Sequence, residues 1–177
     1  MPTPEGTLDW APLAEHLDLV APAVAAVAAR VPRARVAAID PDLADTAAFC
    51  AAYDVALAAS ANCVVVAGRR GGATTHAAVM VLATDRADVN GVVRRHLDVR
   101  KISFAPMVEA VALTGMEYGG ITPVGLPQTW PVLVDEGVVA AGPVVIGSGL
   151  RSSKLLIDGA DLAALGGVVL PLALPTH

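Results

Sequence analysis

The segment from residue 61 to residue 83 restricts the fold more than any other part of the chain. It begins with a short apolar run at 61–67, where β-branched residues follow one another as in a buried strand. Residues 68–72 form a glycine-rich turn, and a second apolar run at 75–83 returns from it. The pattern predicts an antiparallel hairpin. Because an isolated hairpin is at best marginally stable in water, other elements must cover it.

The rest of the chain alternates between short helical and short extended patterns. Apolar residues recur at helical spacing over 10–30, which predicts a helix there. Further helices are predicted from residue 40 onward, over 88–97, between 106 and 115, and over 161–165, where an apolar tail follows. Extended segments are predicted at 35–39, 100–103, 131–135, 144–146 and 154–157. Since these elements do not form a run of strand–helix–strand units, we expect the α+β class with a mixed, mostly antiparallel sheet.

The chain length indicates one domain, and the apolar content raises the question of a membrane. A chain of 177 residues has the size of a single domain, which we take as residues 1–177. Mean hydropathy is +0.60, but the longest apolar stretch, 20–29, contains Pro22. A membrane-spanning helix needs about 18 or more apolar residues, so we expect none. The first residues also lack the basic and apolar regions of a secretory signal.

The charged residues are unevenly distributed. The formal net charge is −5, which argues against a protein that coats nucleic acid in general. Nine of the 12 cations lie between residues 61 and 160, partly as close pairs. These pairs are either solvated surface residues or a local patch for phosphate groups. Only Lys101 and Lys154 are lysines, and each could mark a position that needs a compact ammonium group.

The cysteines and histidines give no metal or disulfide pattern. Cys50 and Cys63 lack C-x-x-C spacing, so neither a disulfide framework nor a structural zinc site is expected. Two free thiols are typical of a reducing compartment, and we therefore expect a cytoplasmic protein. The four histidines, including His177, show no metal-ligand spacing with a carboxylate.

Three stretches are candidates for a binding site. Residues 119–127 form a glycine- and proline-rich loop that suits a carbonyl oxygen or an anion, although a tight surface turn is the alternative. Residues 147–154 combine glycines with cations but match neither the P-loop nor the dinucleotide spacing, so a plain hairpin turn stays open. In the third stretch, 99–104, strand alternation points Arg100 and Lys101 to opposite sides, one of them inward unless the strand is at a wet edge.

Together and in this order, these stretches resemble the YbaK/EbsC family, also called the prolyl-tRNA-synthetase-associated domain. The resemblance is strongest over 60–167. It is carried by the segments Arg100-Lys101-Ile-Ser103, Thr114-Gly115, Gly119-Gly-Ile-Thr-Pro-Val-Gly125, Pro131-Val-Leu-Val-Asp135, Gly147-Ser-Gly149 and Asp161-Leu162. Members are trans-editing deacylases, which hydrolyse the ester that joins a wrongly attached amino acid to the 3′ end of tRNA. The resemblance implies a mixed, barrel-like sheet flanked by helices, the tRNA acceptor 3′ end as partner, and neither a metal nor an organic cofactor.

The resemblance also implies roles for individual residues. The amides of Gly119 and Gly120 would stabilise an oxyanion, and Lys101 would favour the negatively charged transition state or anchor a phosphate, so these three are the predicted catalytic residues. The predicted substrate-binding residues are Asn62, Cys63, Ile121, Thr122, Pro123, Gly125, Asp135, Gly147, Ser148, Gly149, Arg151 and Lys154.

One position departs from the family pattern. Many members carry a functional lysine on the strand that corresponds to residues 61–67. Here that position is Cys63, or Asn62 if the register shifts by one residue. A neutral thiol cannot stabilise developing charge, and an amide can only donate a neutral hydrogen bond. Lys101, on a neighbouring strand, is the candidate to substitute for the missing lysine.

Three hypotheses of different classes follow. The first is a deacylase of mischarged tRNA. The second is a catalytically silent module of the same fold that binds a nucleotide, aminoacyl-tRNA or a partner aminoacyl-tRNA synthetase, and the third is an interaction protein whose glycine loops are plain turns. A monomer and a homodimer both remain compatible with the sequence, and no membrane partner is expected. The edited amino acid stays open, because the preference of a small pocket rests on one or two side chains.

Overall fold

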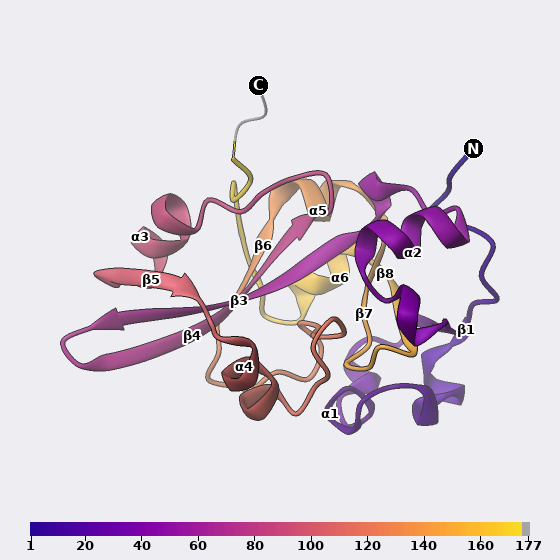
Figure 1. The fold of residues 1–177 in the computed structure, drawn as a ribbon, viewed down its shortest axis with the longest axis horizontal. Helices are drawn as coiled ribbons and strands as arrows, with labels where there is room; N and C mark the ends of the chain where they lie inside the picture. The colour runs from indigo at the N-terminus through magenta and orange to yellow at the C-terminus, as the bar shows by residue number, and fades with distance from the viewer. Residues whose placement is uncertain (175–177) are drawn as a thin grey trace.

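The structure, a computed structural model that describes residues 1–174, is organised by two β-sheets (Figure 1). His177 lies outside the described residues. The predicted hairpin is confirmed and is longer than expected, because β3 (Ala61–Arg70) and β4 (Ala73–Leu82) pair along their whole length. Only Gly71 and Gly72 form the turn, both at positive φ, as a tight two-residue hairpin turn requires.

The hairpin is the centre of a five-stranded sheet. β5 (Lys101–Phe104) pairs antiparallel with β3 on one side. On the other side, β6 (Val132–Asp135) pairs parallel with β4, and β9 (Val168–Leu170) pairs parallel with β6. The strand β9 comes from the predicted apolar tail, which the sequence did not indicate as a strand.

A four-stranded antiparallel sheet forms the second layer. Its strand order is β1 (Ala11–Pro12), β2 (Arg35–Ala38), β8 (Ser153–Asp158) and β7 (Pro143–Gly147). The two sheets meet where Ser60, just before β3, forms a single bridge with Val145 of β7. The mixed, mostly antiparallel α+β class is confirmed, but the barrel-like sheet is not: among residues 1–174 the strands form two separate sheets and no closed barrel.

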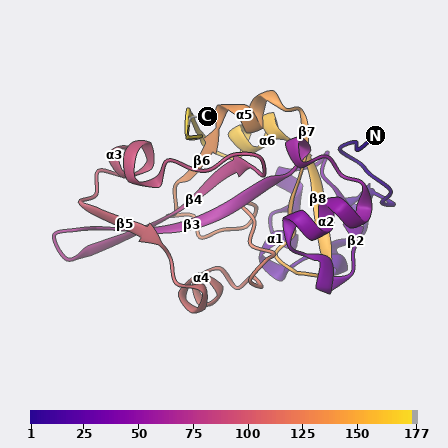
Figure 2. The ribbon, with the colours of Figure 1, turned by 45° about the horizontal axis from the view of Figure 1, so that its top comes forward.

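Short helices cover the sheets. In chain order they are α1 (Pro22–Ala25), α2 (Thr46–Tyr53), the π-helix η6 (Val89–Val93), α3 (Arg94–Leu97), α4 (Met107–Thr114), α5 (Glu136–Ala140) and α6 (Gly159–Ala164). The helices α3 and α4 lie on opposite sides of the hairpin, and α2 lies beside β8 at the other end of the molecule (Figures 1 and 2). None of the helices within residues 1–174 is long and apolar enough to cross a membrane.

The predicted helix over 10–30 is wrong. This segment holds β1, three 3₁₀ turns at Leu13–Glu15, Leu17–Leu19 and Ala28–Arg30, and the single turn of α1. Three of the apolar residues at helical spacing, Leu13, Val20 and Val24, are nevertheless buried in the core. The reason for the breaks is Pro12 and Pro22, because proline lacks an N–H and restricts the residue before it to extended backbone.

Two other helices begin and end as their cap residues predict. Pro106 precedes α4, and Gly115 ends it in the left-handed region at φ 69°, where glycine is favoured. The side chain of Asp88 accepts hydrogen bonds from the amides of Gly91 and Val92 at the start of η6. By contrast, Asp40 caps only the 3₁₀ turn Pro41–Leu43, and α2 begins later, at Thr46.

Candidate active site

A cavity of about 540 Å³ lies where the two sheets meet. It is bounded by the start of α2, the first half of β3, the end of β7, the start of β8 and the loop before Ile121. The residues that line it are Ala44, Asp45, Thr46, Ala47, Phe49, Leu57, Ser60, Ala61, Asn62, Cys63, Val64, Ala83, Tyr118, Gly119, Ile121, Val145, Ile146, Gly147 and Lys154. Most of them are apolar or small, as is typical of a ligand pocket with a few polar groups.

Lys154 is the cation of this cavity, and it is 7% exposed. Its Nζ donates a hydrogen bond to the carbonyl oxygen of Ala44 at 2.9 Å and lies 5.2 Å from the ring centre of Phe49. Both contacts favour the charged form, and a charged lysine has two further N–H groups to offer a ligand. Burial lowers the pKa of Lys154 from its ordinary value of 10.5, and the nearby positive charge of Arg151 acts in the same direction.

Cys63 lines the same cavity, but its thiol is neutral and therefore a poor nucleophile. Burial raises the pKa of its thiol to about 12, so the sulfur carries no charge near neutral pH. Next to it, Asn62 accepts a hydrogen bond from the hydroxyl of Thr46 at 2.7 Å, which joins β3 to the start of α2. Neither residue offers the positive charge that the family pattern places on this strand, whereas Lys154 on β8 offers it in the same cavity.

The glycine loop forms one wall of the cavity. Gly119 adopts φ 87°, which residues with a side chain rarely adopt, and its amide makes no hydrogen bond within residues 1–174. The amide of Gly120 donates to the carbonyl oxygen of Glu117 at 2.9 Å, so it is already used inside the loop. The amide of Ile121, like that of Gly119, has no acceptor within the described chain. Of the two amides predicted to stabilise an oxyanion, that of Gly119 is therefore free and that of Gly120 is not, whereas the amide of Ile121 is free.

Close backbone packing holds this loop against the second sheet. A Cβ atom on Gly147 would lie 2.5 Å from the carbonyl oxygen of Gly120 and 2.8 Å from that of Ile121. The amide of Gly149 donates to the carbonyl oxygen of Gly120 at 2.7 Å, and the amide of Glu117 donates to the carbonyl oxygen of Gly149 at 2.9 Å. Glycine at 147 is thus needed for the approach of two backbone segments.

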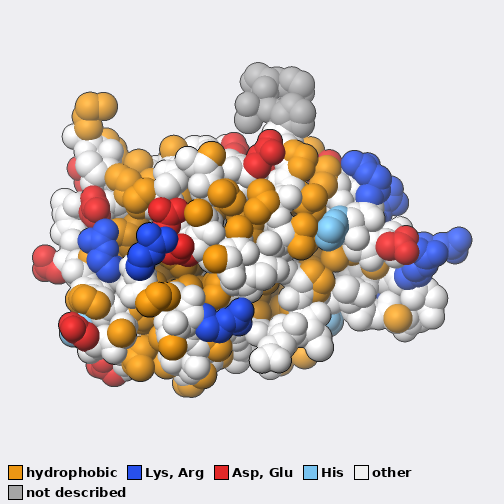
Figure 3. All heavy atoms as spheres, turned by 180° about the vertical axis from the view of Figure 1, so that it is seen from behind, with side chains coloured by type: hydrophobic (Ala, Val, Ile, Leu, Met, Phe, Trp, Pro, Cys, Tyr) orange, Lys and Arg blue, Asp and Glu red, His pale blue; other side chains and the backbone are white. Residues whose placement is uncertain are grey.

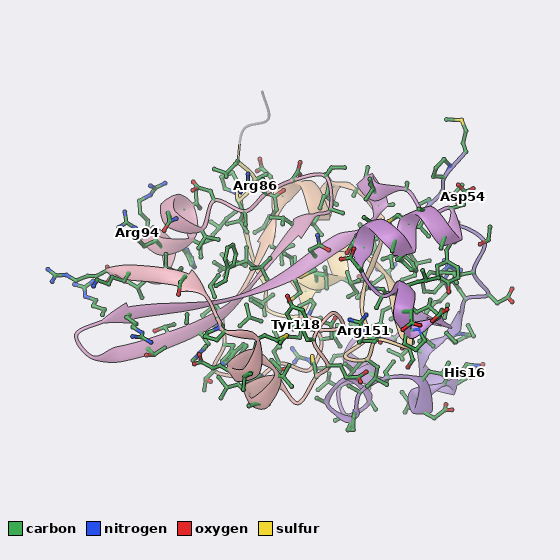
Figure 4. The ribbon with its side chains drawn as sticks, viewed as in Figure 1. His16, Asp54, Arg86, Arg94, Tyr118 and Arg151 are labelled. Atoms are coloured by element: carbon green, nitrogen blue, oxygen red, sulfur yellow. The ribbon has the colours of Figure 1, made fainter. Side chains whose placement is uncertain are left out.

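Arg151 fastens the outer side of the same loop. Its guanidinium donates to the carbonyl oxygens of Tyr118 at 3.2 Å and Pro41 at 3.0 Å, and its amide donates to the carboxylate of Glu117 at 2.8 Å. Figure 4 shows the labelled side chains of Arg151 and Tyr118 close together below β3. Arg151 is therefore a positioning residue for the loop, while the exposed ring of Tyr118 lies at the rim of the cavity.

The structure brings some predicted site residues together. Six of them line the cavity: Asn62, Cys63, Gly119, Ile121, Gly147 and Lys154. Four others, Gly120, Ser148, Gly149 and Arg151, support its wall from behind. The hydroxyl of Ser148 is fully buried and bonds within its own loop, to the carbonyl oxygens of Leu150 and Ser153.

Lys101 does not belong to this group. The register of β5 places it opposite Arg69, next to the turn of the hairpin, where it is exposed. The reason is topological, because β5 runs antiparallel to β3 and starts at the end of β3 that is remote from Cys63. The structure therefore does not support Lys101 as the substitute for the missing strand lysine.

Four more predicted residues lie elsewhere. Pro123 and Gly125 line a separate groove beside Trp130, and the hydroxyl of Thr122 is fully buried with no hydrogen-bond partner in the described chain. The carboxylate of Asp135 is buried and accepts hydrogen bonds from three amides, those of Gly137, Leu172 and Ala173. It begins α5 and holds the C-terminal segment, which is a structural role.

The lining residues that the sequence analysis missed include Asp45, Thr46, Phe49 and Tyr118. The signal for the first three is the Asp-Thr pair that begins α2, which the sequence analysis assigned to the interior of a helix starting at residue 40. Within residues 1–174 no group of three or more potential metal-ligating side chains is found. The polar groups of the cavity are instead one ammonium, one carboxylate, hydroxyls, an amide side chain and free backbone amides.

Comparison with known proteins agrees with this architecture. The sequence matches the family model of the aminoacyl-tRNA editing domain over residues 40–165, which is more than half of the chain. The protein therefore belongs to the aminoacyl-tRNA editing domain family, and the resemblance seen in the sequence is confirmed at this level. None of the curated proteins matches the sequence.

Solved structures share the fold. The hypothetical protein APE2540 superimposes with a TM-score of 0.74 at 23% identity, over 84% of this chain and 96% of its own. A protein proposed to be a trans-editing enzyme for prolyl-tRNA synthetase gives the same TM-score at 21% identity, over 88% of this chain and 99% of its own. At these identities the likeness concerns the fold alone.

Proposed function

We propose that this protein is an aminoacyl-tRNA deacylase that hydrolyses the ester of mischarged tRNA in the cavity between the sheets. The observation that carries the proposal is the buried ammonium of Lys154, which lines the same cavity as Gly119 and Ile121, whose amides have no acceptor within residues 1–174. Hydrogen-bond donors that are fixed in advance stabilise the charge that develops on an ester oxygen. The family membership supports the same chemistry.

In this proposal, the 3′-terminal aminoacyl group enters the cavity with its carbonyl oxygen toward these donors. The oxygen of a water molecule bonds to the carbonyl carbon, and the negative charge on the carbonyl oxygen is stabilised by Lys154 and the amides of Gly119 and Ile121. The bond from that carbon to the ribose oxygen then breaks, the ribose oxygen takes up the proton that the attacking water has given up, and the free amino acid leaves. Among the described residues, Asp45 is the carboxylate that lines the cavity, so the lining offers no pair of carboxylates to act as general acid and general base. In this proposal, orientation of the substrate in the cavity therefore supplies much of the rate.

The proposal assigns Lys154 the duty that family members give to a lysine on the strand equivalent to β3. Cys63 takes that strand position here, and its thiol stays neutral because burial raises its pKa. Lys154 reaches the same space from β8, on the other sheet. The catalytic charge would thus come from the wall of the cavity that lies opposite β3.

The test is a deacylation panel of mischarged tRNAs at micromolar enzyme. It includes tRNA for proline, because one structural neighbour is proposed to act for prolyl-tRNA synthetase. We expect at least one substrate to be hydrolysed faster than in buffer, and the rate to fall with Lys154→Met. A panel in which no substrate is faster than buffer would overturn the proposal.

A second candidate is a binding module of the same fold without turnover, which acts with an aminoacyl-tRNA synthetase. The neutral Cys63 at the strand position favours it. It predicts that wild-type protein binds a non-hydrolysable aminoacyl-adenosine analogue while every deacylation trace stays flat. It also predicts that Cys63→Lys gains turnover, whereas in a working Lys154 enzyme a second buried ammonium in the cavity is expected to reduce the rate.

A further inference from the structure

Cations gather at the tip of the β3–β4 hairpin, far from the cavity. The tip cluster consists of Arg69, Arg70, Arg94, Arg100 and Lys101, which is five of the 12 cations of a chain with net charge −5. They line two adjacent surface cavities of about 300 and 580 Å³ that share three of the cations. Figure 3, seen from behind, shows Lys and Arg side chains at this projecting end, apart from a second group on the broad part of the molecule.

Most of this charge is unpaired. Arg70 forms an ion pair with the carboxylate of Asp98, which lies beside the tip cluster. Arg94 donates a hydrogen bond to the carbonyl oxygen of Asn90. Within residues 1–174, Arg69, Arg100 and Lys101 have no carboxylate partner. Cations of one sign on a projecting element repel one another, and a polyanion that lies across them relieves this repulsion.

The tip cluster and the cavity are connected by one strand. Arg69 is six residues from Cys63 on β3, so the two lie on the same face of the strand and about 20 Å apart at 3.3 Å per residue. A ligand that reaches both must therefore be long and must carry its negative charge well away from the reacting end. A free amino acid or a mononucleotide is too short for this.

We propose that the tip cluster binds the phosphate backbone of the RNA whose aminoacylated 3′ end enters the cavity. The inference rests on the proposed function, because it places the body of the same tRNA. Arginine suits this purpose, since its planar fork binds phosphate oxygens in pairs. Contacts of this kind hold the RNA in register without reading its bases, so the cluster contributes affinity rather than a choice of sequence.

The test is the salt dependence of tRNA binding by the double variant Arg69→Gln/Arg100→Gln. Binding of uncharged tRNA is followed by fluorescence anisotropy at several salt concentrations. Each lost phosphate contact lowers the slope of log affinity against log salt by about 0.7–0.9, so we expect a slope smaller by about 1.5. The affinity at low salt is expected to fall about tenfold. Arg86→Gln, which changes an exposed arginine away from the tip (Figure 4), is the matched control and should leave the slope unchanged.

Two readouts separate this proposal from the proposed function. Hydrolysis of aminoacyl-adenosine, which has no phosphates, should proceed at the same rate in the double variant, while KM for mischarged tRNA rises. If wild-type protein hydrolyses nothing but the double variant still shows a smaller slope of log affinity against log salt, the RNA-binding role of the tip cluster is supported and the deacylase proposal is overturned. A double variant with the wild-type slope overturns the tip cluster, and so does wild-type protein that binds an acidic peptide in preference to tRNA.

Discussion

The two ends of β3 show how differently one strand can use positive charge. At its start, Asn62 and Cys63 face a cavity that contains one buried ammonium, Lys154, and no exposed cation. At its end, Arg69 and Arg70 belong to a cluster of exposed cations around the hairpin turn. The length of the hairpin keeps the two environments apart.

The two environments differ in the free-energy cost of holding a positive charge, and this cost determines what each charge can do. A buried charge costs several kcal/mol of desolvation unless its contacts compensate, and Lys154 has a carbonyl oxygen and an aromatic ring for this purpose. An exposed cation costs little, and a surface ion pair such as Arg70–Asp98 contributes about 0–1 kcal/mol. A single buried charge suits a catalytic role. Several exposed charges suit the long-range attraction of a polyanion, which salt weakens.

The largest expected effect concerns the thiol at the cavity end of the strand. Since burial raises the pKa of Cys63 to about 12, its thiolate fraction at pH 8 is roughly a thousandfold below that of a thiol with the ordinary value of 9.0. We expect alkylation of Cys63 by iodoacetamide, followed by peptide mass spectrometry, to be slower by about that factor than alkylation of a free cysteine peptide. Alkylation at the peptide rate would contradict the raised pKa of Cys63.

A smaller effect is expected from adding a methyl group at each end. In Gly147→Ala the new Cβ meets the carbonyl oxygens of Gly120 and Ile121, so the loop must move. We expect deacylation to fall about tenfold and the free energy of unfolding to fall by about 1–3 kcal/mol. Gly72→Ala at the tip meets no atom within 4 Å, and its cost comes from the backbone strain at φ of 82°, so it serves as the comparison for a methyl group added far from the cavity. Equal loss of deacylation in both variants would contradict the close packing of the loop.

The smallest effect is a pH dependence of stability. Because burial lowers the pKa of Lys154, the unfolded chain binds more protons than the native protein between that lowered value and 10.5. The contribution of Lys154 to stability therefore rises with pH across this window, while the raised pKa of Cys63 makes stability fall above 9.0. The difference in urea unfolding between wild type and Lys154→Met isolates the lysine. We expect wild type to gain stability relative to the variant as pH increases, and a difference that is constant with pH would contradict the burial of a charged lysine.

Local signals in the sequence predicted most of the sheet. The hairpin is marked by its valines and its two-glycine turn, and α4 is marked by Pro106 and Gly115. The helix predicted over 10–30 is wrong because the prediction rested on the spacing of apolar residues. Pro12 and Pro22 break a helix even where that spacing is helical. The strand β9 has no local signal beyond its apolar residues, because its pairing with β6 depends on segments more than 30 residues apart.

The candidate site was predictable in its parts and not in its assembly. The glycine loop, β7 and β8 could be identified, and six predicted residues do share one cavity. Which lysine reaches that cavity depends on the direction of β5 and on the way the second sheet meets the first. A hint was available, because Lys154 begins a strand whose next residues, Leu155 to Ile157, are all apolar and buried, whereas Lys101 follows directly on Arg100.

The most direct test of the account compares the two lysines in single-turnover hydrolysis of aminoacyl-adenosine. Lys154→Met keeps much of the apolar stem but removes the ammonium from the cavity, and we expect the rate to fall by about a hundredfold or more. Lys101→Met removes an exposed cation at the hairpin tip, and we expect the rate to change by less than about twofold. Circular dichroism of both variants checks that they fold. The opposite result, a large loss with Lys101→Met and none with Lys154→Met, would contradict the assignment of the catalytic charge to β8.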